Sequence, residues 1–149
     1  MPKTAEDFRD DILNVGAWSA LSQLLRHVVV DILLTVGELR RISEKGTWLQ
    51  EASHTENYGY VLLEGRVSVE RAEHGQLEVV SPSLIGEMMQ FNPTELRTAT
   101  VSTITSCLVL RFTWEDFWQK MAERLNDQDC GAVRNALESV SWARFTELD

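Results

Sequence analysis

The sequence is poor in the residues that build metal sites and disulfide frameworks. It has two cysteines, three histidines and three prolines in 149 residues. Cys107 and Cys130 are far apart and form no Cys-x-x-Cys pair, and His27, His54 and His74 each stand alone. This spacing excludes the common zinc motifs and gives a metal-dependent β-barrel enzyme none of its ligands. We therefore expect no metal site and a reducing compartment.

Positive charge is also scarce. Fourteen lysines and arginines against twenty-three aspartates and glutamates give a formal net charge of -9. The summed field of such a chain repels the phosphates of nucleic acids and anionic membrane surfaces. We therefore expect no DNA binding and no membrane association. Any anionic ligand has to be captured by a local group of donors.

Long apolar runs and catalytic signatures are missing as well. The run VVVDILLTV is too short to cross a bilayer, and Asp31 interrupts it. The first residues, MPKTAEDFRDDILN, carry acids where a secretory signal needs a basic end and an apolar stretch. No Gly-x-Ser-x-Gly elbow occurs. We expect a cytoplasmic protein that is not an enzyme.

The composition that remains is that of an ordinary globular protein. Hydrophobic residues make up 44% of the chain and charged residues 25%, values typical of a folded domain. A length of 149 residues favours one hydrophobic core. We therefore expect a single domain over residues 1–149.

Helical periodicity occupies residues 4–36. Apolar residues recur there at three-to-four spacing, which predicts two helices. We expect Thr4 to cap the first helix, Gly16 to separate the two and Gly37 to end the second.

Short runs of β-branched and apolar residues fill residues 38–112. Turn residues such as Glu64-Gly65 separate them, and Val67 and Val69 alternate with polar neighbours. Such a pattern predicts an antiparallel β-sandwich or small barrel. The expected strands are residues 39–43, 47–50, 58–63, 66–71, 77–81, 98–106 and 107–112.

Helical periodicity returns over residues 113–142. Thr113 is expected to cap the first of two helices. The stretch NDQDCG, residues 126–131, interrupts the pattern, so we place the second helix at about 129–142. Its apolar side is formed by Val133, Leu137 and Val140.

The stretch GEMMQFNPTELRTATV, residues 86–101, has the parts of an anion clamp. Gly86 permits close backbone approach, and a helical turn after it offers free N–H groups to a phosphate. Arg97 can donate two parallel hydrogen bonds to phosphate oxygens, and the Thr98 hydroxyl can add another. Glu87 would repel a phosphate but can accept a proton from a sugar hydroxyl. The stretch predicts a clamp for a ribose phosphate.

YGYVLLEGRVSV, followed by IGEMM, RTATV and CLVLRF, resembles the cyclic nucleotide-binding domain with its phosphate-binding cassette. The similarity covers roughly residues 20–142. It implies an α+β fold: an antiparallel double-stranded β-helix, or jelly-roll-like β-roll, flanked by N-terminal helices and two C-terminal helices. It also implies cAMP or cGMP as the ligand, and no cofactor.

The resemblance gives each residue of the cassette a role. Glu87 looks like the acceptor for the ribose 2′-hydroxyl, and Arg97 like the ligand of the cyclic phosphate. Thr98 stands where a hydroxyl contacts the phosphate or a guanine edge. The remaining matched positions are Gly86, Met88 and Met89 in the cassette turn, and Ala99 after it.

A lid over the base is a further implication of the resemblance. In that family a side chain from the C-terminal helix or its tail often covers the base. Trp142 and Phe145 lie where such a lid could arise, with Leu137 and Val140 as competitors for the role. The alternative for all four is the packing of a terminal helix.

Two functions are consistent with these patterns. The first is a regulatory sensor that passes the movement of its C-terminal helices to a protein effector or a dimer mate. The second is a nucleotide-free β-roll scaffold for dimerisation or partner docking, in which Glu87 and Arg97 pair with each other. The apolar stripe in LLRHVVVDILL, residues 24–34, motivates the scaffold, because it can pack against another chain or against this one.

Overall fold

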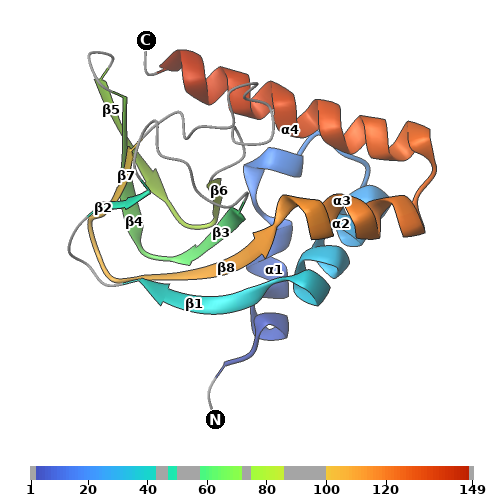
Figure 1. Ribbon diagram of the computed structural model, residues 1–149, viewed down its shortest axis with the longest axis horizontal. Coiled ribbons are helices and arrows are strands. Elements are labelled where there is room, and N and C mark those ends of the chain that lie inside the picture. The colour runs from blue at the N-terminus through green and yellow to red at the C-terminus, as the bar shows by residue number, and fades with distance from the viewer. Residues whose placement is uncertain (1–2, 43–46, 50–57, 72–74, 86–99, 148–149) are drawn as a thin grey trace.

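The computed structural model describes residues 3–42, 47–49, 58–71, 75–85 and 100–147, which form helices, then strands, then helices (Figure 1). The helical elements are η1 (Ala5–Phe8), α1 (Arg9–Leu13), η2 (Gly16–Trp18), α2 (Gln23–Val36), α3 (Trp114–Arg124) and α4 (Asp127–Glu147). The strands are β1 (Glu38–Ile42), β2 (Thr47–Leu49), β3 (Tyr58–Glu64), β4 (Arg66–Arg71), β5 (Gly75–Val80), β6 (Ser83–Ile85), β7 (Thr100–Thr103) and β8 (Cys107–Thr113).

The strands form two four-stranded antiparallel sheets. One sheet has the order β1-β8-β3-β6 and the other the order β2-β7-β4-β5. The chain moves from the first sheet to the second at Gly65, whose φ of 104° lies in the left-handed region that favours glycine. The α+β class and the β-roll flanked by helices, predicted from the sequence, are confirmed, and the sheets do not close into a barrel.

Polar side chains fix the beginnings of the helices. The Thr4 N–H donates to Asp7 Oδ2 at 2.8 Å, which closes a capping box at η1. Before α3, Thr113 Oγ1 accepts from the Asp116 N–H at 3.2 Å. These contacts confirm both caps that the sequence predicts.

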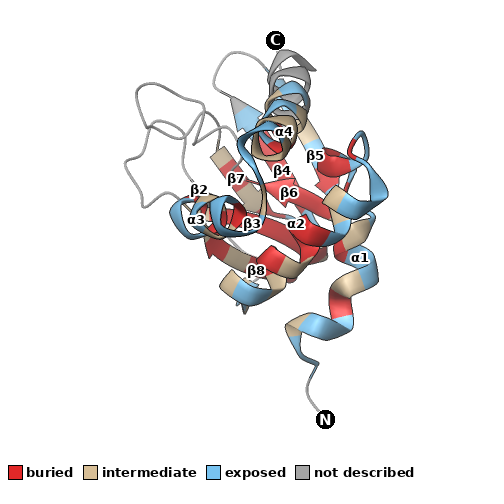
Figure 2. Cartoon of the chain, turned by 90° about the vertical axis from the view of Figure 1, so that its right-hand side faces the viewer, coloured by how far each residue is buried: buried red, intermediate tan, exposed pale blue. Residues whose placement is uncertain are grey.

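The first sheet separates two apolar cores, because alternate residues of a strand face opposite sides. On β8, Leu108 and Leu110 face the helices, whereas Cys107 and Val109 face the second sheet. We call the first the helical core and the second the inter-sheet core. Figure 2 shows buried residues running through β3 and β8, with exposed residues on the outer sides of the helices.

The apolar stripe of α2 is buried within this chain. Val29, Val30, Ile32 and Leu33 are at most 2% exposed, and α2 packs against α1, α3 and β8. Among the described residues of the stripe, Leu24 is the one that is largely exposed, at 76%. The stripe therefore packs within this chain, and it gives no support to the hypothesis of docking against a second chain.

Several elements differ from the sequence-based expectation. Helix α4 begins at Asp127 and runs to Glu147, earlier and longer than the predicted 129–142. The stretch expected to interrupt the helix starts it, since Asn126 Oδ1 accepts from the Asp129 N–H at 2.8 Å. Strand β6 is absent from the predicted strands, and β5 begins at Gly75, two residues before the predicted strand at 77–81.

Candidate functional site

The seven residues of the predicted cassette lie outside the residues that the structure describes. Their roles therefore stay predictions. They are Gly86, Glu87, Met88, Met89, Arg97, Thr98 and Ala99. The structure describes Ile85, which precedes the segment 86–99, and Thr100, which follows it.

The two ends of the segment belong to different sheets. Strand β6 ends at Ile85, which pairs with Tyr60 of β3 in the first sheet. Strand β7 begins at Thr100, which pairs with Glu70 of β4 in the second sheet. The segment therefore joins the two sheets, and each of its ends is fixed by a hydrogen-bonded ladder.

The inter-sheet core lies directly beside both ends. Ile85 is 2% exposed and Val101, the residue after Thr100, is 5% exposed, and both belong to this core. Val101 pairs with Val69 across the second sheet. Apolar packing thus fixes the backbone where the predicted cassette begins and ends.

A row of side chains that sequence reasoning missed crosses the first sheet from Ile85. The register pairs Ile85 with Tyr60, Tyr60 with Arg111, and Arg111 with Glu38. Directly paired residues of antiparallel strands project from the same face. Tyr60 and Ile85 belong to the inter-sheet core, so Arg111 and Glu38 lie on that face too. The alternation in CLVLRF, which puts Arg111 on the side of Val109, was the available signal.

Arg111 is held by a carboxylate and an aromatic ring. Its Nη2 donates to Glu38 Oε1 at 2.7 Å, and its guanidinium carbon lies 4.6 Å from the centre of the Tyr58 ring. Hydrogen bonds from Arg40 and then from Arg111 lower the pKa of Glu38. The hydrogen bond to Glu38 raises the pKa of Arg111. At neutral pH this part of the sheet therefore carries a fixed positive guanidinium beside a fixed carboxylate.

The four predicted lid residues all lie on α4. Leu137 is 1% exposed and packs in the helical core together with Val133, so it would have to leave that core to cover a ligand. The side chains of Val140, Trp142 and Phe145 are not among those described, although the helix extends past all three. The lid role of these residues stays a prediction.

The two cysteines are free thiols in unreactive surroundings. Burial raises the pKa of Cys107, whose Sγ donates to the Thr105 carbonyl oxygen at 3.2 Å. Burial, followed by the charges of Asp127 and Asp129, raises the pKa of Cys130. Neither thiol is poised as a nucleophile.

The described part of the chain has neither a cluster of metal-ligating side chains nor a helix suited to a membrane. No cluster of three or more histidine, cysteine, aspartate or glutamate side chains there has the geometry to hold a metal ion. None of the helices there combines the length and the apolar character needed to cross a membrane.

Comparison with solved structures identifies the fold. The domain matches a cyclic nucleotide-binding domain from Methylobacillus flagellatus with a TM-score of 0.73 and 18% identity, over 97% of this chain and 82% of that one. It matches the regulatory domain of Toxoplasma gondii PKA, crystallised with cAMP, with a TM-score of 0.68 and 16% identity, over 94% of this chain and 50% of that one. The N-terminal domain of a transcriptional regulator from Streptomyces coelicolor A3(2) matches with a TM-score of 0.61 and 23% identity, over 94% and 95%.

Comparison of sequences identifies the family. No curated protein matches this chain. The profile of the cyclic nucleotide-binding domain matches residues 40–124, which is more than half of the chain and includes all of the segment 86–99. This is a family of regulatory domains, and the chain belongs to the cyclic nucleotide-binding domain family.

Proposed function

We propose that this domain is a cyclic nucleotide sensor that binds cAMP or cGMP through the segment 86–99. One observation carries the proposal: the family profile spans a segment that retains both Glu87 and Arg97. The described structure supports it, since Ile85 and Thr100 fix the ends of that segment to the two sheets.

Each residue of the segment has a chemical task in this proposal. The Arg97 guanidinium donates two charge-assisted hydrogen bonds to the cyclic phosphate, and Thr98 adds a hydroxyl. Glu87 accepts the ribose 2′-hydroxyl. Gly86, Met88, Met89 and Ala99 bring backbone N–H groups close to the phosphate. The overall charge of -9 makes this local donor set necessary, because the rest of the molecule repels an anion.

The C-terminal helices carry the output in this proposal. Helix α4 packs against η2 and α3, and Val133 and Leu137 anchor its first half in the helical core. The second half carries Trp142 and Phe145, the proposed lid. A ligand that binds better when α4 covers it shifts the helix toward that position, and couplings of about 1–3 kcal/mol are typical of such shifts. A protein effector or a dimer mate then reads the position of α4.

The similar structures are consistent with this role. The Toxoplasma gondii domain is regulatory and was crystallised with cAMP, and the Streptomyces coelicolor domain belongs to a transcriptional regulator. Both are regulatory parts of larger systems, so we infer that this domain regulates a partner and catalyses no reaction itself. We further infer that residues 1–149 act as one unit in the cytoplasm, where free thiols such as Cys107 and Cys130 persist.

Calorimetric titration with cAMP and with cGMP tests the proposal. The wild-type domain should bind at least one of them, and Arg97→Ala should weaken that binding by about 100-fold or more, since two hydrogen bonds to a charged group contribute about 1.5–3 kcal/mol each. The matched control is Arg66→Ala, because Arg66 is a half-exposed arginine that pairs with Glu78 at 3.0 Å outside the segment. It should leave the affinity unchanged.

Two outcomes would contradict the proposal. Equal affinity of the wild-type and the Arg97→Ala domains would remove the phosphate role of Arg97. Absence of binding to both nucleotides, together with no shift in melting temperature, would favour the nucleotide-free scaffold instead. Thermal unfolding of each variant without ligand shows that a loss of binding does not come from a loss of fold.

A further inference from the structure

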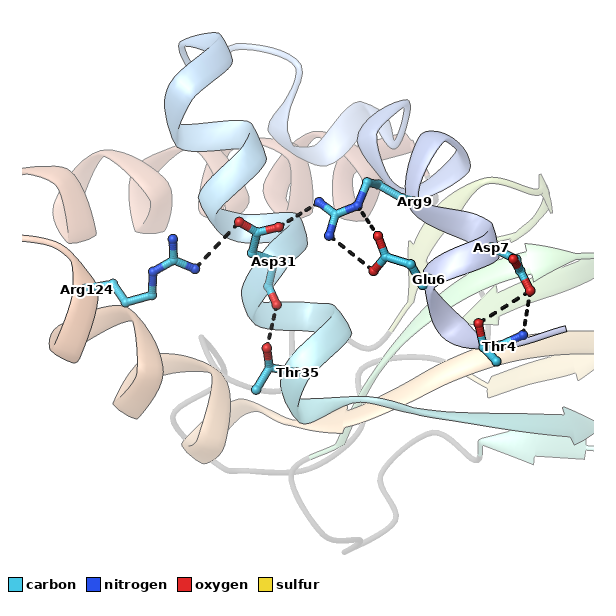
Figure 3. Close-up of polar contacts among 7 residues, drawn as sticks. All are labelled: Thr4, Glu6, Asp7, Arg9, Asp31, Thr35 and Arg124. Carbon is cyan, nitrogen blue, oxygen red and sulfur yellow. Dashed lines mark hydrogen bonds and ion pairs between the residues drawn. The ribbon is translucent and has the colours of Figure 1, made fainter.

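Asp31 is a charged residue in the most apolar helix of the chain. It lies in α2 between Val30 and Ile32, which are both buried. Its side chain is 40% exposed and sits at the surface between α1 and α3 (Figure 3). A solvated position needs no partner, yet this carboxylate faces a guanidinium on each side.

The two oxygens of Asp31 face different parts of the fold. Oδ1 accepts from Arg9 Nη1 at 2.6 Å, so this oxygen holds the N-terminal helix α1. Oδ2 lies 3.8 Å from Arg124 Nη1, on the last residue of α3. The first contact is a short charged hydrogen bond, whereas the second exceeds hydrogen-bond distance and is an attraction between charges alone.

Arg9 is the better-fixed partner of the two. Its Nε and Nη2 donate to the two oxygens of Glu6 at 2.7 and 3.2 Å, which leaves Nη1 directed at Asp31 (Figure 3). The hydrogen bonds to Glu6 and then to Asp31 raise the pKa of Arg9. The N-terminal helices therefore present to α2 a permanently charged donor that is oriented by Glu6.

Arg124 lies at the junction of the two C-terminal helices. It is the last residue of α3, and α4 begins three residues later at Asp127. The Leu125 N–H donates to the Met121 carbonyl oxygen at 2.8 Å, and Asn126 caps α4. A change in the contacts of Arg124 therefore acts close to the residue at which α4 begins.

We propose that Arg9 and Arg124 compete for the carboxylate of Asp31, so that the docking of the N-terminal helices controls how tightly the α3–α4 junction is held. While Arg9 is docked, it draws Asp31 into a short hydrogen bond and leaves Arg124 at a distance. When Arg9 is withdrawn, the carboxylate turns to Arg124 and pulls the end of α3 toward α2. The competition requires no nucleotide and stands apart from the proposed binding function.

A double-mutant cycle measures this competition directly. The coupling between Asp31 and Arg124 is obtained from the urea unfolding of the wild type, Asp31→Asn, Arg124→Gln and the double variant, and the cycle is repeated in an Arg9→Gln background. With Arg9 present, we expect the interaction between Asp31 and Arg124 to change the unfolding equilibrium constant by less than about twofold. With Arg9→Gln we expect about threefold to fivefold, the range of well-formed exposed ion pairs.

An ion pair within α3, the helix that ends at Arg124, is the matched control. Lys120 Nζ lies 3.3 Å from Glu123 Oε2, and both side chains are about half exposed. The coupling of this pair should be the same in both backgrounds, because it is separate from the ion pairs that Asp31 forms with Arg9 and Arg124. Equal Asp31–Arg124 coupling with and without Arg9 would overturn the proposal, and so would an equal rise in the control pair.

Amide hydrogen exchange gives an independent readout. Arg9→Gln should slow the exchange of the amides around Leu125 and Asn126, although it removes a contact elsewhere. Asp31→Asn should speed the exchange both there and in α1. If Arg9→Gln instead speeds exchange at the α3–α4 junction, the three residues form a simple brace and the competition is wrong.

Discussion

The helical core and the inter-sheet core are built from different kinds of side chain. The helical core contains Phe112, Trp114 and Phe117, all at most 2% exposed. Trp114 and Phe117 meet edge to face at 5.4 Å and 87°, and Phe112 and Trp114 at 4.8 Å and 79°. The inter-sheet core consists mainly of valines from β4, β5, β7 and β8, with Tyr60 buried in it and Tyr58 packed against it.

Because of this difference, the side chains that contribute most to stability lie away from the candidate site. Aromatic side chains bury the most area and leave the largest cavities when they are removed. They lie on the far side of the first sheet from Ile85 and Val101, which border the segment 86–99. The face beside the candidate site is built mainly from smaller aliphatic groups, although Tyr60 pairs with Ile85 there. Changes there should therefore affect the shape of the site before they unfold the domain.

Truncation of one buried side chain in each core is the strongest test of this comparison. Phe117→Ala deletes a ring that contacts three other aromatic rings and should destabilise the domain by about 3–5 kcal/mol. Val109→Ala deletes two methyl groups from a fully buried position and should cost about 2 kcal/mol. Urea unfolding of both variants measures these changes. A larger loss for Val109→Ala would mean that the inter-sheet core carries the greater share of the stability.

Two glycines test how closely the aromatic cluster is packed. A methyl group on Gly59 of β3 would lie 2.6 Å from Phe112 Cζ and 2.8 Å from Trp114 Cε2. Gly59→Ala should therefore cost about 1–3 kcal/mol through overpacking. Gly131 of α4 has nothing within 4 Å of the same methyl position, so Gly131→Ala should stabilise the domain by about 0.4–1 kcal/mol. Thermal or urea unfolding measures both, and a neutral Gly59→Ala would show that the aromatic cluster can yield.

The smallest expected effect concerns the polar end of the first sheet. The pKa of Glu38 lies below its ordinary value of 4.5, first because of Arg40 and then because of Arg111. A lowered carboxyl pKa contributes stability that is fully present above the ordinary value and is lost as the pH falls through the folded value. Wild type should therefore exceed Glu38→Gln in stability at pH 7, and the two should converge in acid below pH 4.5. Urea midpoints across this range measure the difference, and a constant gap would assign it to packing instead of charge.

Strong periodic patterns made most of the fold predictable. The alternation around Val67 and Val69, the caps at Thr4 and Thr113 and the end of α2 at Gly37 were all readable, because each reflects a local rule of backbone geometry. Strand β6 was not, because it has only three residues and follows Pro82. Its strand character comes from pairing with β3, a contact that local sequence does not encode.

The beginning of α4 shows how a polar stretch can be misinterpreted. The sequence pattern predicts an interruption at residues 126–131, whereas Asn126 caps the helix and Asp127 and Asp129 form its acidic first turn. For the candidate site, the motif at 86–99 predicts the segment, and the structure adds the two sheets to which Ile85 and Thr100 belong. The pairing of Arg111 with Glu38 was not predictable, since the two residues are 73 positions apart in the chain.

Helix α3 is attached at its first residue to the paired strands β1 and β8. Gly37 alone separates the end of α2 from β1, α3 follows β8 without a break, and Glu38 pairs with Arg111. The base of α3 is thereby held by the sheet, whereas its far end is held by side-chain packing, with Met121 fully buried in the helical core. Eleven residues at 1.5 Å each make an arm of roughly 16 Å, so a tilt of about 10° displaces its tip by roughly 3 Å. A shift of that size is the difference between a direct ion pair and one separated by a water molecule. A small rotation of α3 that leaves the strands in place would therefore be enough to change the contacts of Arg124.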